Sequence, residues 1–272
     1  MASVERAELK PGYDISRILK GGWHLAGDHG DIDRGQAVKD MAAFVEAGIT
    51  TFDCADIYTG VEELIGDFRR AYPSLAKGIR VHTKHVPDYD IMATADAAYT
   101  EGIIDRSLQR LGMDCLDMVQ YCWWDTDVPR YIDTAMTLKA LQDKGKIAES
   151  SVTNFNAEIM AELKEAGFPM LTNQLQYSVL DRRAENVTVN FCRENGIQLL
   201  CYGSLAGGFL SDGWLGKPEP TEAFSNRSLT KYKLIIEDFG GWALFQELLQ
   251  ALKNVGDRHG SSIAQVAVRW VL

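Results

Sequence analysis

The 272-residue sequence lacks any apolar run approaching the roughly 20 residues that a membrane-spanning helix needs. Its first 20 residues are mostly polar and lack the apolar core of a secretory signal peptide. Basic residues are outnumbered, with 28 Lys and Arg against 38 Asp and Glu, a net charge of −10. Such a protein has no evident basic face for nucleic acid or an anionic membrane. We therefore expect a soluble protein that acts on small molecules.

Cysteine is sparse, and its spacing does not suggest disulfides. The five cysteines are odd in number, form no C-x-x-C pair and lie mostly in apolar segments. This usage indicates buried thiols in a reducing cytoplasm rather than a disulfide framework. Asp53 and Asp56 are close in sequence, but no histidine cluster with ligand spacing accompanies them. We accordingly expect no metal site.

The sequence does contain a regular alternation of short apolar runs and helical patterns. Strands are expected at residues 15–19, 49–53, 79–83, 116–121, 147–152, 170–175 and 197–202. Helices are expected at residues 34–47, 61–72, 94–111, 130–144, 156–166 and 184–195, most of them followed by glycine. Strands alternating with helices in this way predict βαβ units and a parallel sheet.

The alternation is compatible with a (β/α)8 TIM barrel or an open doubly wound sheet. No G-x-G-x-x-G follows the first strand, although an open dinucleotide-binding sheet would usually carry one. Polar residues also end several strands, namely Asp53, Lys84, Asn154, Gln174 and Tyr202. In a barrel these ends converge on one mouth, where active sites are built. We therefore predict a single barrel domain over residues 1–272.

Three residues near the predicted mouth suggest proton chemistry. Tyr58 follows Asp53 by five positions, and Lys84 ends the next strand. A partly desolvated lysine needs a carboxylate partner. A Lys–Asp pair beside a phenol lowers the phenol's pKa from about 10, so that it can protonate a carbonyl oxygen. The alternative is that Tyr58 is a half-buried aromatic residue in a loop.

Several longer motifs accompany these residues. They are GGW at 21–23, DRSLQRLGMDCLDMVQ at 105–120, VTNFN at 152–156, NQLQYSVLDRR at 173–183 and YGSLAGGFL at 202–210. Together with Asp53, Tyr58 and Lys84, they resemble the aldo-keto reductase family in order and spacing, from about Gly21 to the end of the chain.

The resemblance implies an NADPH-dependent oxidoreductase that reduces an aldehyde or ketone, with NADH left open. Tyr58 would be the general acid, tuned by Lys84 and Asp53. The positions implied to bind the cofactor are Gly22, Trp23, Asp53, Thr153, Asn154, Gln174, Tyr202, Gly203, Ser204, Leu205 and Gly207. Those implied to face the substrate are Trp23, Tyr58, Trp123 and Trp124. The protein would position the cofactor, which carries the redox chemistry.

One catalytic position departs from the family. A histidine usually follows the fourth strand, and Cys122 stands there. A thiol is a weak donor, and loss of one oxyanion donor costs on the order of 10² to 10³ in rate. We therefore expect Cys122 to occupy a catalytic position and the enzyme's activity to be weakened, the alternative being an inert, half-buried thiol. His85 is the best candidate to stand in, the alternative being an ordinary loop histidine.

The C-terminal part departs as well. Family members close the barrel with an eighth strand and further helices that hold the 2′-phosphate, and this chain ends at Leu272. Residues 231–239 are expected to be helix, the alternative being an eighth strand that closes the barrel. The sequence therefore predicts a barrel without its last unit, either a fragment or a poor binder of the cofactor. A catalytically impaired, nucleotide-binding or regulatory barrel is the alternative function.

Overall fold

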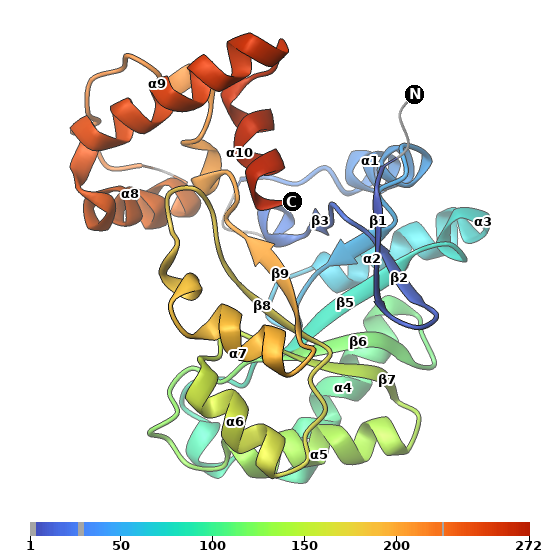
Figure 1. The fold of residues 1–272 in the computed structure, drawn as a ribbon. Helices are drawn as coiled ribbons and strands as arrows, with labels where there is room; N and C mark the ends of the chain where they lie inside the picture. The colour runs from blue at the N-terminus through green and yellow to red at the C-terminus, as the bar shows by residue number, and fades with distance from the viewer. Residues whose placement is uncertain (1–3, 27–29, 225) are drawn as a thin grey trace. The chain divides into compact units, whose positions relative to one another are not determined.

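The computed structural model describes residues 4–26, 30–224 and 226–272 (Figure 1). Contacts between residues divide the chain into two compact units. The first unit extends to Asn173 and includes Cys192–Gln198, and the second comprises Gln174–Phe191 and Leu199–Leu272. The single domain that we predicted from the sequence stays a prediction.

The main sheet has seven strands among the described residues, in the order of the chain. They are β3 (Lys20–Gly21), β4 (Thr51–Asp53), β5 (Arg80–His85), β6 (Leu116–Tyr121), β7 (Ile147–Thr153), β8 (Thr172–Gln176) and β9 (Gln198–Tyr202). Strands β3 to β7 pair in parallel, each with the next. This succession confirms the predicted (β/α)8 type of fold, with seven of its strands present in the part that the structure describes.

The helices lie between and after these strands. They are α1 (Arg34–Glu46), α2 (Val61–Ala71), α3 (Pro73–Ala76), α4 (Ala97–Leu111), α5 (Tyr131–Asp143), α6 (Ala157–Glu165), α7 (Thr188–Glu194), α8 (Arg227–Phe239), α9 (Gly241–His259) and α10 (Ile263–Val271). Short 3-10 turns include Trp23–Leu25 and Ala206–Gly208. Local chemistry sets several of the ends. Asp33, Asp96 and Asn156 cap α1, α4 and α6 through their side chains, and Gly112 ends α4 with a φ of 63°.

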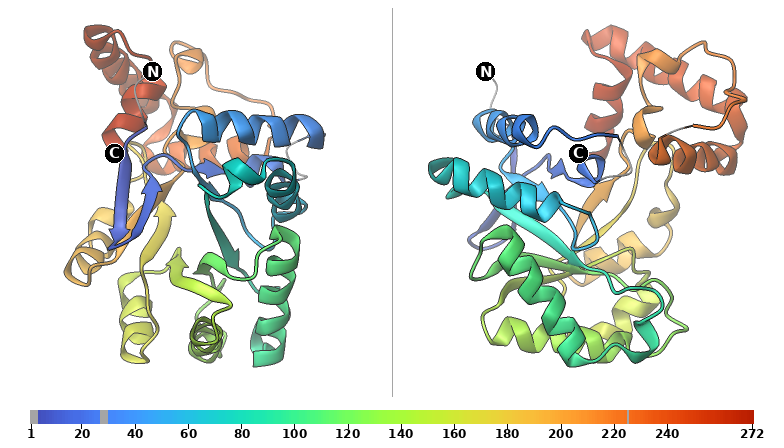
Figure 2. Two further views of the ribbon diagram at one scale, coloured as in Figure 1. Left: turned by 90° about the vertical axis from the view of Figure 1, so that its right-hand side faces the viewer. Right: turned by 180° about the vertical axis from the view of Figure 1, so that it is seen from behind.

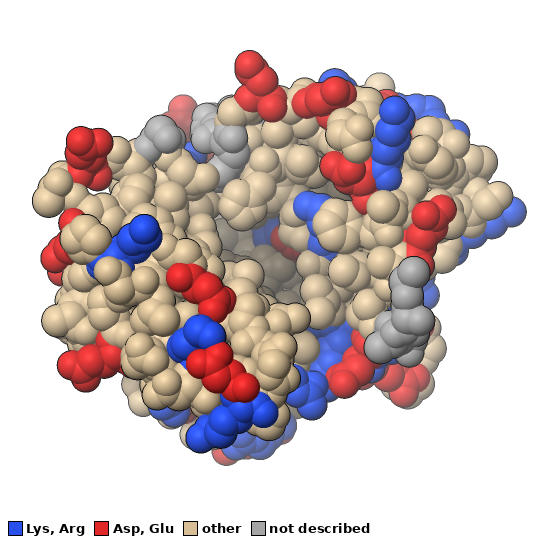
Figure 3. All heavy atoms as spheres, turned by 90° about the horizontal axis from the view of Figure 1, so that it is seen from above, with Lys and Arg blue, Asp and Glu red and all other residues tan. Residues whose placement is uncertain are grey.

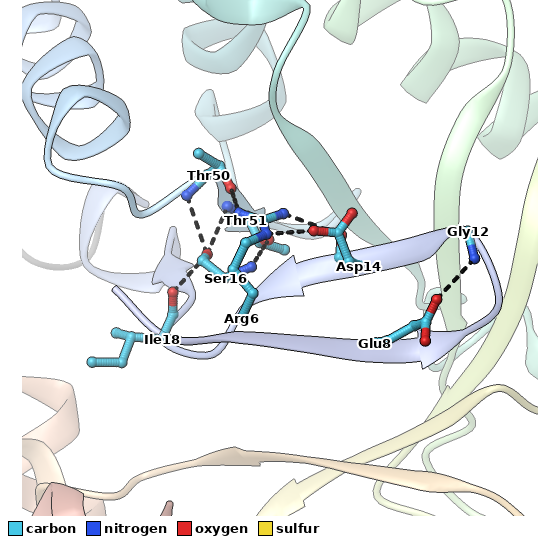
Figure 4. A network of polar contacts seen from close by, with 8 residues as sticks. All are labelled: Arg6, Glu8, Gly12, Asp14, Ser16, Ile18, Thr50 and Thr51. Atoms are coloured by element: carbon cyan, nitrogen blue, oxygen red, sulfur yellow. Dashed lines mark hydrogen bonds and ion pairs between the residues drawn. The ribbon is translucent and has the colours of Figure 1, made fainter. Parts of the chain in front are cut away.

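The predicted first strand at residues 15–19 is wrong. Strand β2 (Tyr13–Ser16) forms an antiparallel hairpin with β1 (Arg6–Lys10), and β3 begins the main sheet. The Ser16 hydroxyl oxygen accepts from the amides of Thr50 and Thr51, each at 3.1 Å (Figure 4). The Ser16 amide donates to Thr51 Oγ1 at 3.0 Å. These bonds fasten the hairpin beside the start of β4, so residues 13–16 cannot be a strand of the barrel.

Helices α2, α4 and α5 lie along the outer side of strands β4 to β7 in the first unit (Figures 1 and 2). The approach of α2 to α4 depends on Gly66. A Cβ atom at that position would lie 2.1 Å from the carbonyl oxygen of Arg110, which no side chain tolerates. Larger residues at Gly66 would therefore push the two helices apart.

The second unit has a hydrophobic core of its own. It includes Phe209 after β9, Tyr232 and Ile236 of α8, and Phe245 and Leu249 of α9. Residues 231–239 contribute to this core from a helix, which confirms the helical prediction over the alternative of a closing strand. Burial of one face of α8 accounts for its formation.

None of the described helices is long and apolar enough to cross a membrane. Within the same residues, no group of three or more His, Cys, Asp and Glu side chains is placed to hold a metal ion. All five cysteines are free thiols. On the face seen from above, acidic and basic side chains are interspersed (Figure 3).

Candidate active site

Asp53, at the end of β4, and Lys84, in β5, form a buried ion pair. Lys84 Nζ lies 2.9 and 2.8 Å from the two carboxylate oxygens of Asp53, and it also donates to the Cys54 carbonyl oxygen at 2.8 Å. Gln120 Nε2 donates to Asp53 Oδ1 at 2.9 Å from the neighbouring strand β6. Burial lowers the pKa of Lys84, but the charges of Asp53 and Tyr58 outweigh it and the pKa is raised. Lys84 is therefore a permanent cation with a fixed position.

Tyr58 is held beside this pair in the loop between β4 and α2. Lys84 Nζ lies 5.1 Å from the centre of the Tyr58 ring, and the Trp23 ring packs edge-on against it at 5.1 Å. Gly22 permits this approach: its amide donates to Asp53 O at 2.7 Å, and a Cβ atom would lie 2.7 Å from Val61 Cγ1. The structure thus brings Trp23, Asp53, Tyr58 and Lys84 together, as the sequence predicted.

The pKa of Tyr58 differs from the sequence-based expectation. We expected the Lys–Asp pair to lower it, but burial raises it, because desolvation outweighs the lowering effect of Lys84. The phenol therefore keeps its proton at neutral pH. A protonated phenol is the form that a general acid requires.

The loop that carries Tyr58 is anchored by Asp56, which is buried. The Asp56 amide donates to Lys84 O at 3.4 Å, and Asp56 Oδ1 accepts from the Val86 amide at 3.2 Å. Arg110 donates to both Asp56 O, at 3.1 Å, and Glu62 Oε2, at 3.3 Å. Burial, aided by the nearby Glu62 carboxylate, raises the pKa of Asp56 to about 7. This network fastens the loop to the end of β5.

Cys122 and His85 occupy buried positions. Cys122 is 7% exposed, and burial raises the pKa of its thiol to about 11, so the thiol stays protonated at neutral pH. His85 is a strand residue rather than a loop histidine, and it is fully buried. Because side chains alternate along a strand, His85 faces away from the side of β5 that carries Lys84. It therefore cannot stand in for the histidine that the family resemblance leads us to expect at position 122.

The two tryptophans after β6 differ in exposure. Trp123 is 5% exposed and donates from Nε1 to Val128 O at 3.1 Å. Trp124 is 53% exposed, and its Nε1 donates to Pro87 O at 2.8 Å. Trp123 thus packs inside the first unit, and Trp124 is the one of the two whose ring is available to a substrate.

Two predicted cofactor residues end β7 in the first unit. Thr153 is buried, and Asn154 follows with a φ of 61°. Asparagine adopts this left-handed region more readily than most residues, and such conformations concentrate at binding sites. The backbone turn at Asn154 therefore lies directly after the end of β7.

The other predicted cofactor residues lie in the second unit. Gln174 is buried in β8, and Tyr202 ends β9 with Lys231 Nζ 4.9 Å from its ring centre. The loop of residues 203–208 follows, and four of its positions have positive φ: Gly203, Ala206, Gly207 and Gly208. The amides of Ser204 and Leu205 donate to no backbone carbonyl of the described residues. Such loops present free amides to anions.

The comparisons with known proteins agree with this arrangement. A model of the Aldo/keto reductase family matches residues 17–272. The chain therefore belongs to the aldo-keto reductase family, whose members are oxidoreductases that use nicotinamide cofactors and act on small carbonyl compounds.

Individual relatives support the same assignment. Aldo-keto reductase YhdN of Bacillus subtilis (strain 168) is 30% identical over 271 residues, covering 96% of this chain and 78% of YhdN. The NADH-specific methylglyoxal reductase of Escherichia coli (strain K12) is 25% identical, covering 95% and 82%. A crystal structure of the thermostable aldo-keto reductase Tm1743 with the inhibitor epalrestat has a TM-score of 0.74 at 21% identity, covering 97% of this chain and 83% of that one.

Sequence reasoning missed two buried residues of the site. Gln120 holds Asp53, and its register opposite Lys84 in the parallel sheet is the signal that identifies it. Asp56 lies between Asp53 and Tyr58, and we considered it only as a metal ligand. The signal that could have identified it is its position in the loop that follows Asp53.

Proposed function

We propose that the protein reduces an aldehyde or ketone to an alcohol with NADPH as hydride donor, and that Tyr58 protonates the carbonyl oxygen. The observation that carries the proposal is the buried Asp53–Lys84 pair with Nζ 5.1 Å from the Tyr58 ring centre. Burial keeps the phenol beside this pair protonated, which is the form that a general acid requires.

The proton step follows from the charges around Tyr58. The phenol is neutral at rest, and burial raises its pKa further above neutral pH. As the carbonyl oxygen gains negative charge, Tyr58 Oη donates its proton, and the tyrosinate left behind is stabilised by the Lys84 ammonium. Asp53 and Gln120 keep Lys84 in place, so little reorganisation accompanies the transfer. Trp23 restricts the ring of Tyr58, and Trp124 offers an aromatic surface to the substrate.

The residues present fit a nicotinamide dinucleotide, which when bound supplies the hydride. The free amides of Ser204 and Leu205 suit a pyrophosphate, and positive φ at Gly203 and Gly207 shapes their loop. We propose that Asn154 and Gln174 orient the carboxamide, with Thr153 beside Asn154, and that Tyr202 stacks on the ring. Gly22 and Trp23 complete the set.

Quenching of tryptophan fluorescence on titration with NADPH and with NADH tests the binding half of this proposal. Saturable quenching with a lower Kd for NADPH than for NADH supports both the proposed cofactor and the protein's preference for NADPH. A lower Kd for NADH would overturn the preference alone. No quenching with either would overturn the proposed cofactor.

A panel of small aldehydes and ketones, followed by the absorbance of NADPH, tests the chemical half. Turnover of at least one carbonyl compound is the expected result. Binding of NADPH without turnover of any compound would instead favour the alternative of a regulatory barrel, which the replacement of histidine by Cys122 makes worth testing.

We further propose that the protein works in the cytoplasm on a freely diffusing substrate, without nucleic acid or membrane as partner. Five free thiols and interspersed surface charges are the supporting observations. A thiol titration of the protein as isolated from cells tests the redox environment, and five reactive thiols after unfolding are expected.

A further inference from the structure

A cavity of about 250 Å³ lies beside the C-terminal ends of α2 and α4 in the first unit. Three of the side chains lining it are cationic, namely Arg69, Arg70 and Lys77, and no acidic residue lines it. Lys77 precedes β5 and Gly112 precedes β6. The cavity is therefore near the amino ends of these strands, whereas the candidate catalytic residues lie at their carboxyl ends.

Arg69 is a cation of this cavity that has no ion-pair partner among the described residues. Its Nε atom is buried and forms no hydrogen bond. Its guanidinium forms no ion pair with any residue in the described part of the chain. Buried donors are nearly always paired, and each exception needs an explanation.

Arg70 is paired on one side only. Its Nη2 donates to Asp67 Oδ1 at 2.5 Å, and Asp67 also accepts from Arg34 at 2.7 Å. Its Nη1 lies beside two glycines, 3.3 Å from where a Cβ of Gly66 would be and 3.9 Å from that of Gly112. The missing side chains leave Nη1 open to the cavity. A single carboxylate shared between two arginines offsets only part of the charge.

Helix capping does not account for Arg69. Cations in the last turn of a helix ordinarily interact with its free carbonyl groups. In α2, however, the Tyr72 amide already bonds to Phe68 O at 2.8 Å, and in α4 the Leu108 carbonyl accepts from the Met113 amide at 3.0 Å. Arg69 donates to no carbonyl group among the described residues. Its charge is thus available for a ligand.

A second cavity shows the ordinary arrangement. It has about 350 Å³ and is lined by Lys144 together with Glu101 and Asp133. Lys144 Nζ lies 4.0 Å from Glu101 Oε2, so the lysine has a carboxylate close by. Of these two cavities, only the first has uncompensated positive charge.

We infer that Arg69, Arg70 and Lys77 form a binding site for a small phosphate-type oxyanion, either inorganic phosphate or the terminal phosphoryl group of a small metabolite. Guanidinium groups donate hydrogen bonds in planar pairs that match phosphate oxygens, and lysine adds a point charge. The volume is below the roughly 300 to 1,000 Å³ of pockets for drug-sized ligands. It suits a phosphoryl group rather than a dinucleotide.

Calorimetric titration of the full chain, without cofactor, with inorganic phosphate and with glycerol 3-phosphate tests the inference. One site per chain is expected, and Arg69→Gln should weaken the binding at least tenfold. Lys144→Gln, at the second cavity, is the matched control and should leave the Kd within twofold. Because Arg69 has no partner to lose, its variant should also keep the melting temperature of the parent protein.

The remaining outcomes are decisive. Tighter binding of glycerol 3-phosphate indicates a phosphorylated metabolite, and tighter binding of phosphate indicates the free ion; both support the site. No saturable binding, or equal Kd values for the parent protein and Arg69→Gln, would overturn it. The second of these results would place the anion elsewhere, for instance at the loop of residues 203–208. Neither outcome depends on reductase activity, so the proposed function stands or falls separately.

Discussion

Two cations of the first unit differ in how the fold treats them. Lys84, at the carboxyl end of the sheet, is enclosed by a carboxylate, a carbonyl and a phenol ring. Arg69, near the amino ends of the strands, has a buried Nε with no partner. The comparison teaches that a cation whose partners all come from its own protein is fixed in place and can act on a neighbouring group. A cation without such partners can instead bind an anionic ligand.

The two faces of β5 show the same contrast between two neighbouring residues. Lys84 is satisfied on one face, while the next residue, His85, is buried with neither ring nitrogen hydrogen-bonded. Since an unpaired polar group in the interior costs free energy, His85 is a weak point of the fold and Lys84 a strong one. Substitutions at the two positions should therefore have opposite effects.

The largest expected effect is that of Lys84→Met. It leaves the Asp53 carboxylate buried without its cation, which costs about 3 to 5 kcal/mol of unfolding free energy. Denaturation in urea measures this loss. Arg69→Gln removes a cation that has no partner, so it should change the unfolding free energy by less than about 0.5 kcal/mol. Equal losses in the two variants would abolish the distinction between the two cations.

Asp56→Asn tests whether the network around Tyr58 includes an incompletely compensated carboxylate. The folded pKa of about 7 lies above the ordinary 3.8. The stability gained from the protonated carboxyl is therefore full below about pH 4 and lost as the pH rises to about 7. As the pH rises from about 4 to about 7, the unfolding free energy of the Asp56→Asn variant should increase relative to that of the parent protein, by up to about 4 kcal/mol.

Unfolding in urea at pH 4.5 and pH 8 gives the difference. Glu62 and Arg106 act on the same carboxyl and are left unsubstituted in this comparison. Asp90→Asn, on the exposed loop after β5, is the control and should have the same effect at both pH values. A pH-independent effect of Asp56→Asn would contradict this account.

His85→Leu should stabilise the protein, most clearly in mild acid. Burial lowers the pKa of His85 to about 4, below the ordinary 6.5. The stability that the neutral imidazole contributes is present above pH 6.5 and lost as the pH falls towards 4. At pH 5 the leucine variant should gain about 2 kcal/mol relative to its effect at pH 8. Thermal unfolding at the two pH values measures the gain.

His82→Leu is the matched comparison. His82 is equally buried, but its Nε2 lies 3.2 Å from Tyr13 Oη, so leucine there leaves a hydroxyl without this partner. At pH 8 this loss should cost about 1 to 3 kcal/mol. If both leucine variants were equally stable at pH 8, the hydrogen-bond argument for His85 would fail.

Cys122→His should raise kcat/KM about tenfold. An imidazole is a stronger donor to a developing oxyanion than a thiol. The larger side chain in a buried position should also lower the unfolding free energy by about 1 to 3 kcal/mol. Steady-state kinetics with the best aldehyde of the panel gives the rate. An unchanged or lower rate would show that this position does not limit the reaction.

The sequence predicted the fold where periodicity was strong and missed it where pairing decided. Residues 116–121 carry apolar side chains at four of six positions and form β6 as predicted. Strand β3 is only Lys20–Gly21, a charged residue and a glycine without apolar pattern, and it exists because it pairs with Phe52 and Asp53. The apolar residues from Ile15 onward have the pattern of a barrel strand, but Ile15 belongs to strand β2 of the hairpin.

The candidate site was predictable where polar residues interrupt apolar strands. Asp53 and Lys84 stand out for that reason, whereas Gln120 became recognisable only through the register of β6 against β5. The anion site could not be predicted, since two arginines at a helix end are commonplace in a sequence. Only the buried, unpaired Nε of Arg69 and the glycines beside Arg70 distinguish it.

The most direct test of the central claim is the single-turnover rate of NADPH oxidation in Tyr58→Phe, at saturating NADPH and aldehyde. Phenylalanine keeps the ring beside Trp23 and Lys84 and removes only the proton donor. The rate should fall by about 10² to 10⁴, with the Kd for NADPH within about twofold of the parent value. A rate within threefold of the parent protein would contradict the assignment of Tyr58 as the general acid.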